Sequence, residues 1–169
     1  MSRLPWILPG ILAYKIATTM VANTVLNALI LACSATSLYW IVCWHYGNHP
    51  AVLASIALMT NPFLISAVCW DYPDGPVIAY AFLAMAFFLR PSSNRVWPAL
   101  CAGASFVLCG YTNLAAIPML VGIVIIPLYR YRRNFKELVR QGVAALFGAF
   151  AATVVFVIFS KILINAYEL

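Results

Sequence analysis

Charged residues are scarce in this chain of 169 residues. They make up 8% of the sequence, whereas an average soluble domain has about 25%, and hydrophobic residues make up 65%. Polar residues are too few to cover the surface of a water-soluble fold of this composition. The scarcity of charge therefore excludes an ordinary soluble domain and predicts an integral membrane protein.

Segments of alternating polarity are also missing, because the apolar runs are continuous. A membrane-spanning β-strand needs about ten residues of alternating polarity, whereas a spanning helix needs about 20 mostly apolar residues. The chain has room for several such helices. We expect an all-α fold, a polytopic transmembrane helical bundle with about five or six spans and short loops, that forms a single transmembrane domain over residues 1–169.

The five cysteines form no CxxC pair, and most lie inside apolar runs, where cysteine behaves as a small hydrophobic residue. His45 and His49 are four positions apart, but Gly47 and Pro50 interrupt the helix that would bring them together. We therefore expect neither a disulfide framework nor a metal site at these residues.

Long apolar runs divide the chain into candidate helices. A proline-interrupted segment at 4–14 predicts a short interfacial or re-entrant helix. Spans are expected at 16–44, 51–69, 76–89 and 141–164. The segment 96–129 is expected to hold two short helices that are broken near Gly110 and Asn113.

Basic residues cluster in one loop, which contains Arg130, Arg132, Arg133, Lys136 and Arg140. Such loops favour the cytoplasmic side, so alternating spans place Arg90 and Arg95 inside and residues 71–74 and 111–113 outside. The loop either sets topology or binds anionic lipid headgroups. The net charge of +6 lies between apolar runs, so we expect the lipid bilayer as a partner and no nucleic acid.

The segment 70–76 (WDYPDGP) holds Asp71 and Asp74, two of the four acidic residues, between two apolar runs. Carboxylates at a membrane boundary usually serve a function, although Pro, Gly and Asp also form ordinary tight turns. A functional pair could bind a divalent metal, orient hydroxyl groups or act as a base, and the spacing does not choose among these roles. Asp71 and Asp74 are the candidate catalytic residues.

Two stripes at helical spacing predict contacts between helices. The polar stripe consists of Thr19, Asn23, Asn27 and Ser34, and the small-residue stripe of Ala144, Gly148 and Ala152. The first is expected to make interhelical hydrogen bonds, and the second to allow another helix to approach closely.

The order of several segments resembles the multi-span glycosyltransferases of the GT-C class, particularly the protein mannosyltransferase and aminoarabinose transferase-like families. The resemblance rests on 4–10 (LPWILPG), 37–47, 61–63 (NPF), 74–76 (DGP) and the broken stretch 102–118. It implies a polyprenyl-phosphate-linked sugar as donor and transfer at the outer membrane face. It also makes Tyr72 and Asn113 candidate substrate-binding residues, although many relatives have a lysine near Asn113.

The resemblance also implies an earlier outer-loop aspartate as catalytic base, but no acid precedes Asp71. We therefore expect a fragment, truncated at both ends, that is inactive alone and lies in the bacterial inner membrane with possible partner helices. The cofactor is undecided, with a divalent metal possible. The alternative is a non-catalytic membrane protein, such as a transporter-like bundle or a packing subunit, although the only candidate buried cations, Lys15 and Lys161, lie near predicted span ends.

Overall fold

The structure, a computed structural model, describes residues 4–69, 73–90, 95–113 and 116–167. Within these ranges every regular element is a helix, which confirms the predicted all-α class. The helices are α1 (Leu4–Ile16), α2 (Thr19–Tyr46), α3 (Asn48–Met59), α4 (Pro62–Cys69), α5 (Asp74–Leu89), α6 (Trp97–Thr112), α7 (Ile117–Arg130) and α8 (Phe135–Tyr167).

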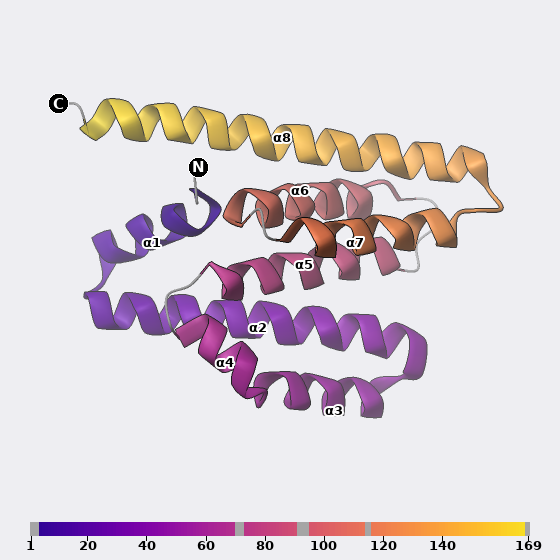
Figure 1. Ribbon diagram of the computed structural model, residues 1–169, viewed down its shortest axis with the longest axis horizontal. Helices are drawn as coiled ribbons and strands as arrows, with labels where there is room; N and C mark the ends of the chain where they lie inside the picture. Colours follow the sequence, from indigo (N-terminus) through magenta and orange to yellow (C-terminus); the bar gives the residue numbers. More distant parts are fainter. Residues whose placement is uncertain (1–3, 70–72, 91–94, 114–115, 168–169) are drawn as a thin grey trace.

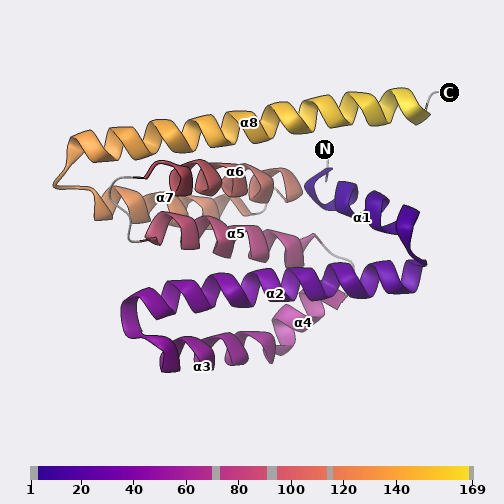
Figure 2. The same cartoon turned by 180° about the vertical axis from the view of Figure 1, so that it is seen from behind.

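The longer helices lie side by side in a row (Figures 1 and 2). Helix α8 packs on α6, α6 on α5, and α5 on α2, while α3 packs on the far side of α2 and α7 on α5. A row has two broad faces, so many apolar side chains stay exposed. Phe147 and Phe150 on α8, for example, are 65% and 67% exposed. Apolar surface of this extent needs lipid or another protein to cover it.

Among the described residues, the number of helices that could span a membrane is lower than the predicted five or six. By length and composition, α2 and α8 are apolar enough to cross a membrane, and α3 with α4 would form a third span if this bent pair is counted as one. Helices α5 and α7 have 16 and 14 residues. At about 1.5 Å per residue they reach roughly 24 and 21 Å, less than the hydrocarbon core of about 30 Å.

The segment predicted as one span at 51–69 contains a bend of 54° between α3 and α4. Pro62 lacks an N–H group and begins α4. The Asn61 side-chain oxygen accepts hydrogen bonds from the backbone N–H groups of Phe63 and Leu64, at 2.9 and 3.2 Å. This arrangement is a helix N-cap, so a new helix starts here instead of the old one continuing.

The predicted break in 96–129 is confirmed at Asn113, which lies between α6 and α7. Tyr111 and Thr112, which we expected in the turn, instead form the end of α6, because the helix continues past Gly110. At the opposite end of the row, Gly47 joins α2 to α3 with φ of +86°. Residues with a side chain rarely adopt this conformation, so glycine permits the sharp reversal.

The small-residue stripe brings α8 against α6, as predicted. A Cβ atom added at Gly148 would lie 2.7 Å from the Leu100 carbonyl carbon, and one added at Gly103 would lie 2.6 Å from that of Ala145. Ordinary carbon–carbon contacts are about 3.5–4.0 Å, so the two backbones approach closely at both glycines.

The polar stripe on α2 behaves only partly as expected. The Tyr14 hydroxyl of α1 donates a hydrogen bond to the Asn23 side-chain oxygen, which joins two helices. The buried Ser34 hydroxyl instead donates to the Ile30 carbonyl of its own helix at 2.9 Å.

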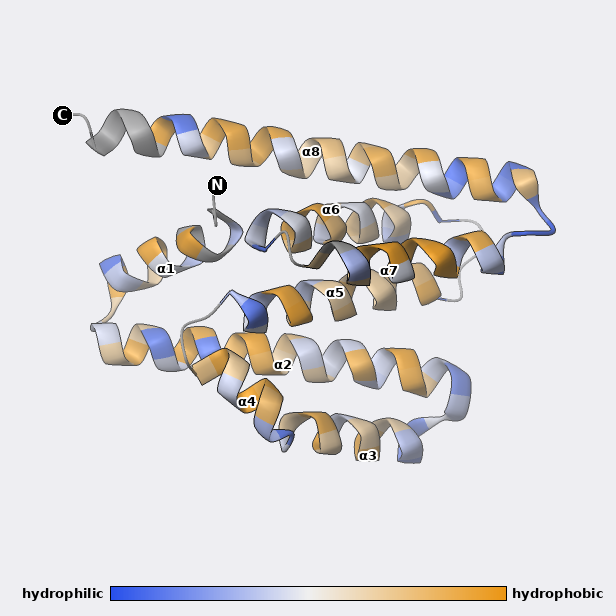
Figure 3. Ribbon diagram, viewed as in Figure 1, coloured by the Kyte–Doolittle hydropathy of each residue, from blue (hydrophilic) through white to orange (hydrophobic). Residues whose placement is uncertain are grey.

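The two ends of the row differ in charge. The basic cluster, predicted as one loop, lies in the short loop between α7 and α8 and in the adjoining ends of both helices. This end of the row is hydrophilic in Figure 3. Arg90 and Arg95 line a recess together with Tyr131, so they lie at this same end. Helix α5 begins and α6 ends at the opposite end of the row (Figure 1). This arrangement agrees with the predicted sidedness, while the assignment of the basic end to the cytoplasm stays a prediction.

Candidate functional site

Asp74 begins helix α5, where the partial positive charge of the helix N-terminus stabilises a carboxylate. The next residue, Gly75, is buried, and a Cβ atom there would lie 3.0 Å from the Val68 side chain and 3.1 Å from its Cα atom. Glycine therefore lets the end of α4 approach the start of α5. Pro76 follows in the first turn, where its missing N–H group breaks no helical hydrogen bond. Together these residues fix the position of an exposed carboxylate.

Asn113 follows the last residue of α6. Its backbone N–H donates to the Cys109 carbonyl at 3.2 Å, and its carbonyl accepts from the Ala116 N–H at 3.1 Å. These bonds hold the residue between α6 and the start of α7, and its side chain is half-buried.

The side chains of Asp74 and Asn113 meet although they are 39 positions apart. The Asn113 amide Nδ2 donates a hydrogen bond to Asp74 Oδ1 at 3.0 Å. Two residues that the sequence proposed for different roles, catalysis and substrate binding, thus form one polar pair. The Asp74 carboxylate keeps its second oxygen as an acceptor, so the pair can receive a hydroxyl group from a ligand.

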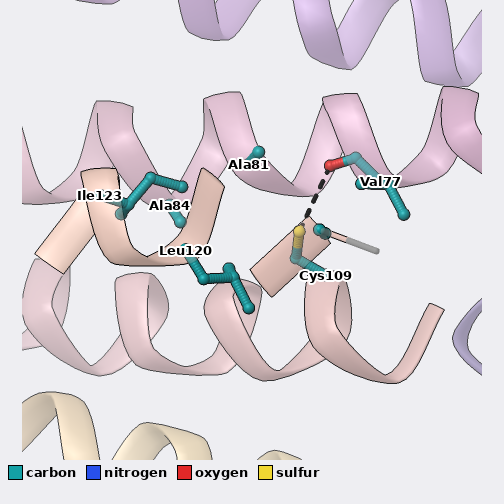
Figure 4. Close-up of a cluster of buried hydrophobic side chains, with 7 residues drawn as sticks. Val77, Ala81, Ala84, Cys109, Leu120 and Ile123 are labelled. Carbon is teal, nitrogen blue, oxygen red and sulfur yellow. Dashed lines mark hydrogen bonds between the residues drawn. The ribbon is translucent and has the colours of Figure 1, made fainter. Parts of the chain in front are cut away.

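A buried cluster lies directly beneath the pair and joins the helices that carry it (Figure 4). The Cys109 thiol donates to the Val77 carbonyl at 3.6 Å, which links α6 to α5 one turn below Asn113 and Asp74. Leu120 and Ile123 of α7 pack into the same cluster. The sequence identified Cys109 only as a small hydrophobic residue, because its neighbours in the sequence do not show that its thiol faces the Val77 carbonyl, 32 positions away.

Helix α1 lies near this end of the row and contacts α2, α6 and α8. The Tyr80 hydroxyl of α5 donates to the Pro5 carbonyl at 3.2 Å. The proline-interrupted segment that we expected at the interface is therefore a helix attached to the bundle near the candidate site.

Two of the predicted site residues, Asp71 and Tyr72, lie outside the described residues. Their relation to Asp74 stays a prediction, as does a metal ion shared between the two aspartates. Within the described ranges, no three His, Cys, Asp or Glu side chains gather closely enough to hold a metal ion.

Comparison of the chain with family models, with curated proteins and with solved structures gives no match. The resemblance to GT-C glycosyltransferases therefore stays a prediction from the sequence. The fold adds that every regular element in the described ranges is a helix and that α2 and α8, with the bent α3–α4 pair if it is counted as one span, are long and apolar enough to cross a membrane.

Proposed function

We propose that this chain forms a donor-binding part of a membrane-embedded glycosyltransferase that uses a polyprenyl-phosphate-linked sugar. The observation that carries the proposal is the hydrogen bond between Asp74 and Asn113 at the end of the row opposite the basic loop. The resemblance points to both positions, although many relatives have a lysine near Asn113. The contact between the two side chains is what a shared site requires.

The role that this geometry favours for Asp74 is to orient the sugar. Its carboxylate accepts one bond from Asn113 and offers its other oxygen to a sugar hydroxyl. Transfer also needs a positioned general base. The resemblance assigns that base to an earlier outer-loop acid without a counterpart before Asp71. We therefore propose that another segment or chain supplies the base, and that this chain alone binds the donor without transferring the sugar.

The proposed setting is a lipid bilayer, in particular the bacterial inner membrane, with Asp74 on its outer face. The exposed apolar surfaces of α2 and α8 support integration into a membrane. The stripe around Gly148 is occupied by α6 within the same chain. It therefore offers no argument for the alternative role as a packing subunit.

The test measures donor binding by the purified chain in liposomes, with polyprenyl-phosphate-linked sugars compared with the bare polyprenyl phosphate. We expect tighter binding of at least one sugar-linked form and no transfer. Asp74→Asn should abolish this preference, because the asparagine can still accept the Asn113 hydrogen bond but has lost the charge.

Asp71→Asn serves as the matched control, and we expect it to have a smaller effect. Equal binding of the bare and sugar-linked lipids by the unmodified chain would refute the proposal. If Asp74→Asn still preferred the sugar-linked lipid, the Asp74 carboxylate would have no part in binding the donor.

A further inference from the structure

A groove of about 350 Å³ runs between α6, α7 and α8, away from the Asp74–Asn113 pair. Its volume falls within the range of small-molecule pockets, about 300–1,000 Å³. Its walls are apolar and include Phe106, Val124, Leu128 and Leu146. The groove has the chemistry of an acyl-chain site.

At the basic end, a recess of about 10 Å³, with room for about one water molecule, adjoins the groove and is lined by two arginines. Phe88 and Gln141 line both spaces, and Arg90 and Arg95 line the recess. Gln141 is 6% exposed, and its amide donates to the Glu137 carboxylate at 2.7 Å and to the Arg95 carbonyl at 3.5 Å. The backbone next to the recess is therefore attached to α8.

The positive charge at this end is not neutralised within the described ranges. Seven basic residues lie here, namely Arg90, Arg95, Arg130, Arg132, Arg133, Lys136 and Arg140. Glu137 is the one described acid at this end, and it already pairs with Arg140 at 2.8 Å. The charge therefore complements an anionic ligand.

Arg90 and Arg95 are available to such a ligand. The Arg90 guanidinium carbon lies over the Trp97 ring, 4.5 Å from its centre, in a cation–π contact that uses none of its N–H donors for a hydrogen bond to an acceptor. In the described part of the chain the Arg95 guanidinium has no hydrogen bond or ion pair. Arg130, in contrast, donates to the Phe88 carbonyl at 3.0 Å. A phosphate outside the recess that contacts these two side chains would meet planar donors suited to its oxygens.

We propose that this end of the chain binds one anionic phospholipid. Its phosphate lies against Arg90 and Arg95, and one acyl chain lies in the groove between α6, α7 and α8. Cationic side chains beside an apolar groove fit an amphiphile, whereas a nucleic acid or a free phosphate would leave the groove empty. Basic pockets between membrane helices bind anionic headgroups in this manner. The proposal does not depend on the glycosyltransferase function.

Two pairs of variants separate the contribution of the lipid headgroup to binding from that of the acyl chain. Arg90→Gln with Arg95→Gln removes the two recess charges, and Arg132→Gln with Arg133→Gln removes two charges from the same end outside the recess. Gly142→Leu fills the groove, because a Cβ atom there meets nothing within 4 Å. Gly122→Leu on α7 is the matched control, since its position is equally open but does not line the groove.

The experiment titrates the detergent-purified chain with phosphatidylglycerol or phosphatidylcholine of identical acyl chains and counts bound lipids by native mass spectrometry. Each arginine near the headgroup is expected to contribute roughly five-fold, so the two together predict about a 25-fold preference for phosphatidylglycerol. Arg90→Gln/Arg95→Gln should reduce this preference to near parity, whereas Arg132→Gln/Arg133→Gln should retain it. Gly142→Leu should weaken binding of both lipids, and Gly122→Leu should leave binding unchanged.

Glycerol phosphate, which has the headgroup charge but no acyl chain, should not compete. Equal affinity for the two lipids in the unmodified chain would overturn the proposal. Equal losses of the phosphatidylglycerol preference in the two double-arginine variants would also overturn the proposal, because they would show that net charge, and not a specific site, attracts the lipid. Displacement of the lipid by glycerol phosphate or by an oligonucleotide would also overturn it, in favour of a phosphate or nucleic-acid surface.

Discussion

The contact between α6 and α8 gives the sharpest test of the packing, through Gly148→Ala. The new methyl group would overlap the Leu100 carbonyl oxygen and would lie 2.7 Å from the carbonyl carbon. Both atoms belong to the backbone and cannot move aside as a flexible side chain would. Because carbon atoms pack at about 3.5–4.0 Å and the oxygen lies closer still, the two helices must separate by at least about 1 Å.

Two opposing effects decide the magnitude. Replacing glycine by alanine within a helix favours the helix by about 1 kcal/mol. Overpacking of a close contact costs about 1–3 kcal/mol, and a separation of 0.5–1 Å forfeits a quarter to a half of each local dispersion contact. Because the opposing atoms belong to the backbone, we expect a cost near the upper end of this range, so that Gly148→Ala lowers the free energy of unfolding by about 2 kcal/mol.

Gly142→Ala on the same helix is the control, because its Cβ atom meets nothing within 4 Å. This variant keeps the propensity gain without the clash and should be as stable as the unmodified chain or more stable. Both variants would be unfolded by denaturant in detergent micelles and followed by circular dichroism. If Gly148→Ala proved as stable as Gly142→Ala, the helices would not approach at this position, and the assigned role of the stripe would be wrong.

Three further predictions test the topology, the bend and the candidate site. In a cysteine-free background, a membrane-impermeant thiol reagent applied to intact cells should label Tyr111→Cys and not Phe135→Cys; the reverse pattern would contradict the orientation. Asn61→Ala removes the cap of α4 and should lower stability by about 1 kcal/mol in denaturant titrations, and an unchanged midpoint would mean that the bend does not need the cap. Asn113→Asp places a second carboxylate beside Asp74 and should cost about 1 kcal/mol at neutral pH by repulsion. Because a like charge raises a carboxyl pKa, this stability should return as the pH falls and one group becomes protonated; a loss independent of pH would show that the side chains do not meet.

Much of the architecture follows from local features of the sequence. Continuous apolar runs predict helices, because a helix satisfies its backbone hydrogen bonds within one segment. The break at Asn113 and the close contact at Gly148 were predicted from residue types and spacing. The number of spans was predicted less well. Helices α5 and α7, with 16 and 14 residues, are shorter than a span needs, and Asn61 and Pro62 start a new helix at a bend of 54° within 51–69.

The sequence by itself determined the apolar composition, the helical class and the separation of the basic loop from the Asp74 segment along the chain. Only the tertiary structure decided that Asp74 meets Asn113, because their hydrogen bond joins the start of one helix to the end of the next. It also decided that Gly148 contacts α6 and that Arg90 and Arg95 line a recess beside an apolar groove. Helical periodicity is set by neighbouring residues, whereas the choice of partner face depends on packing between segments far apart in the chain.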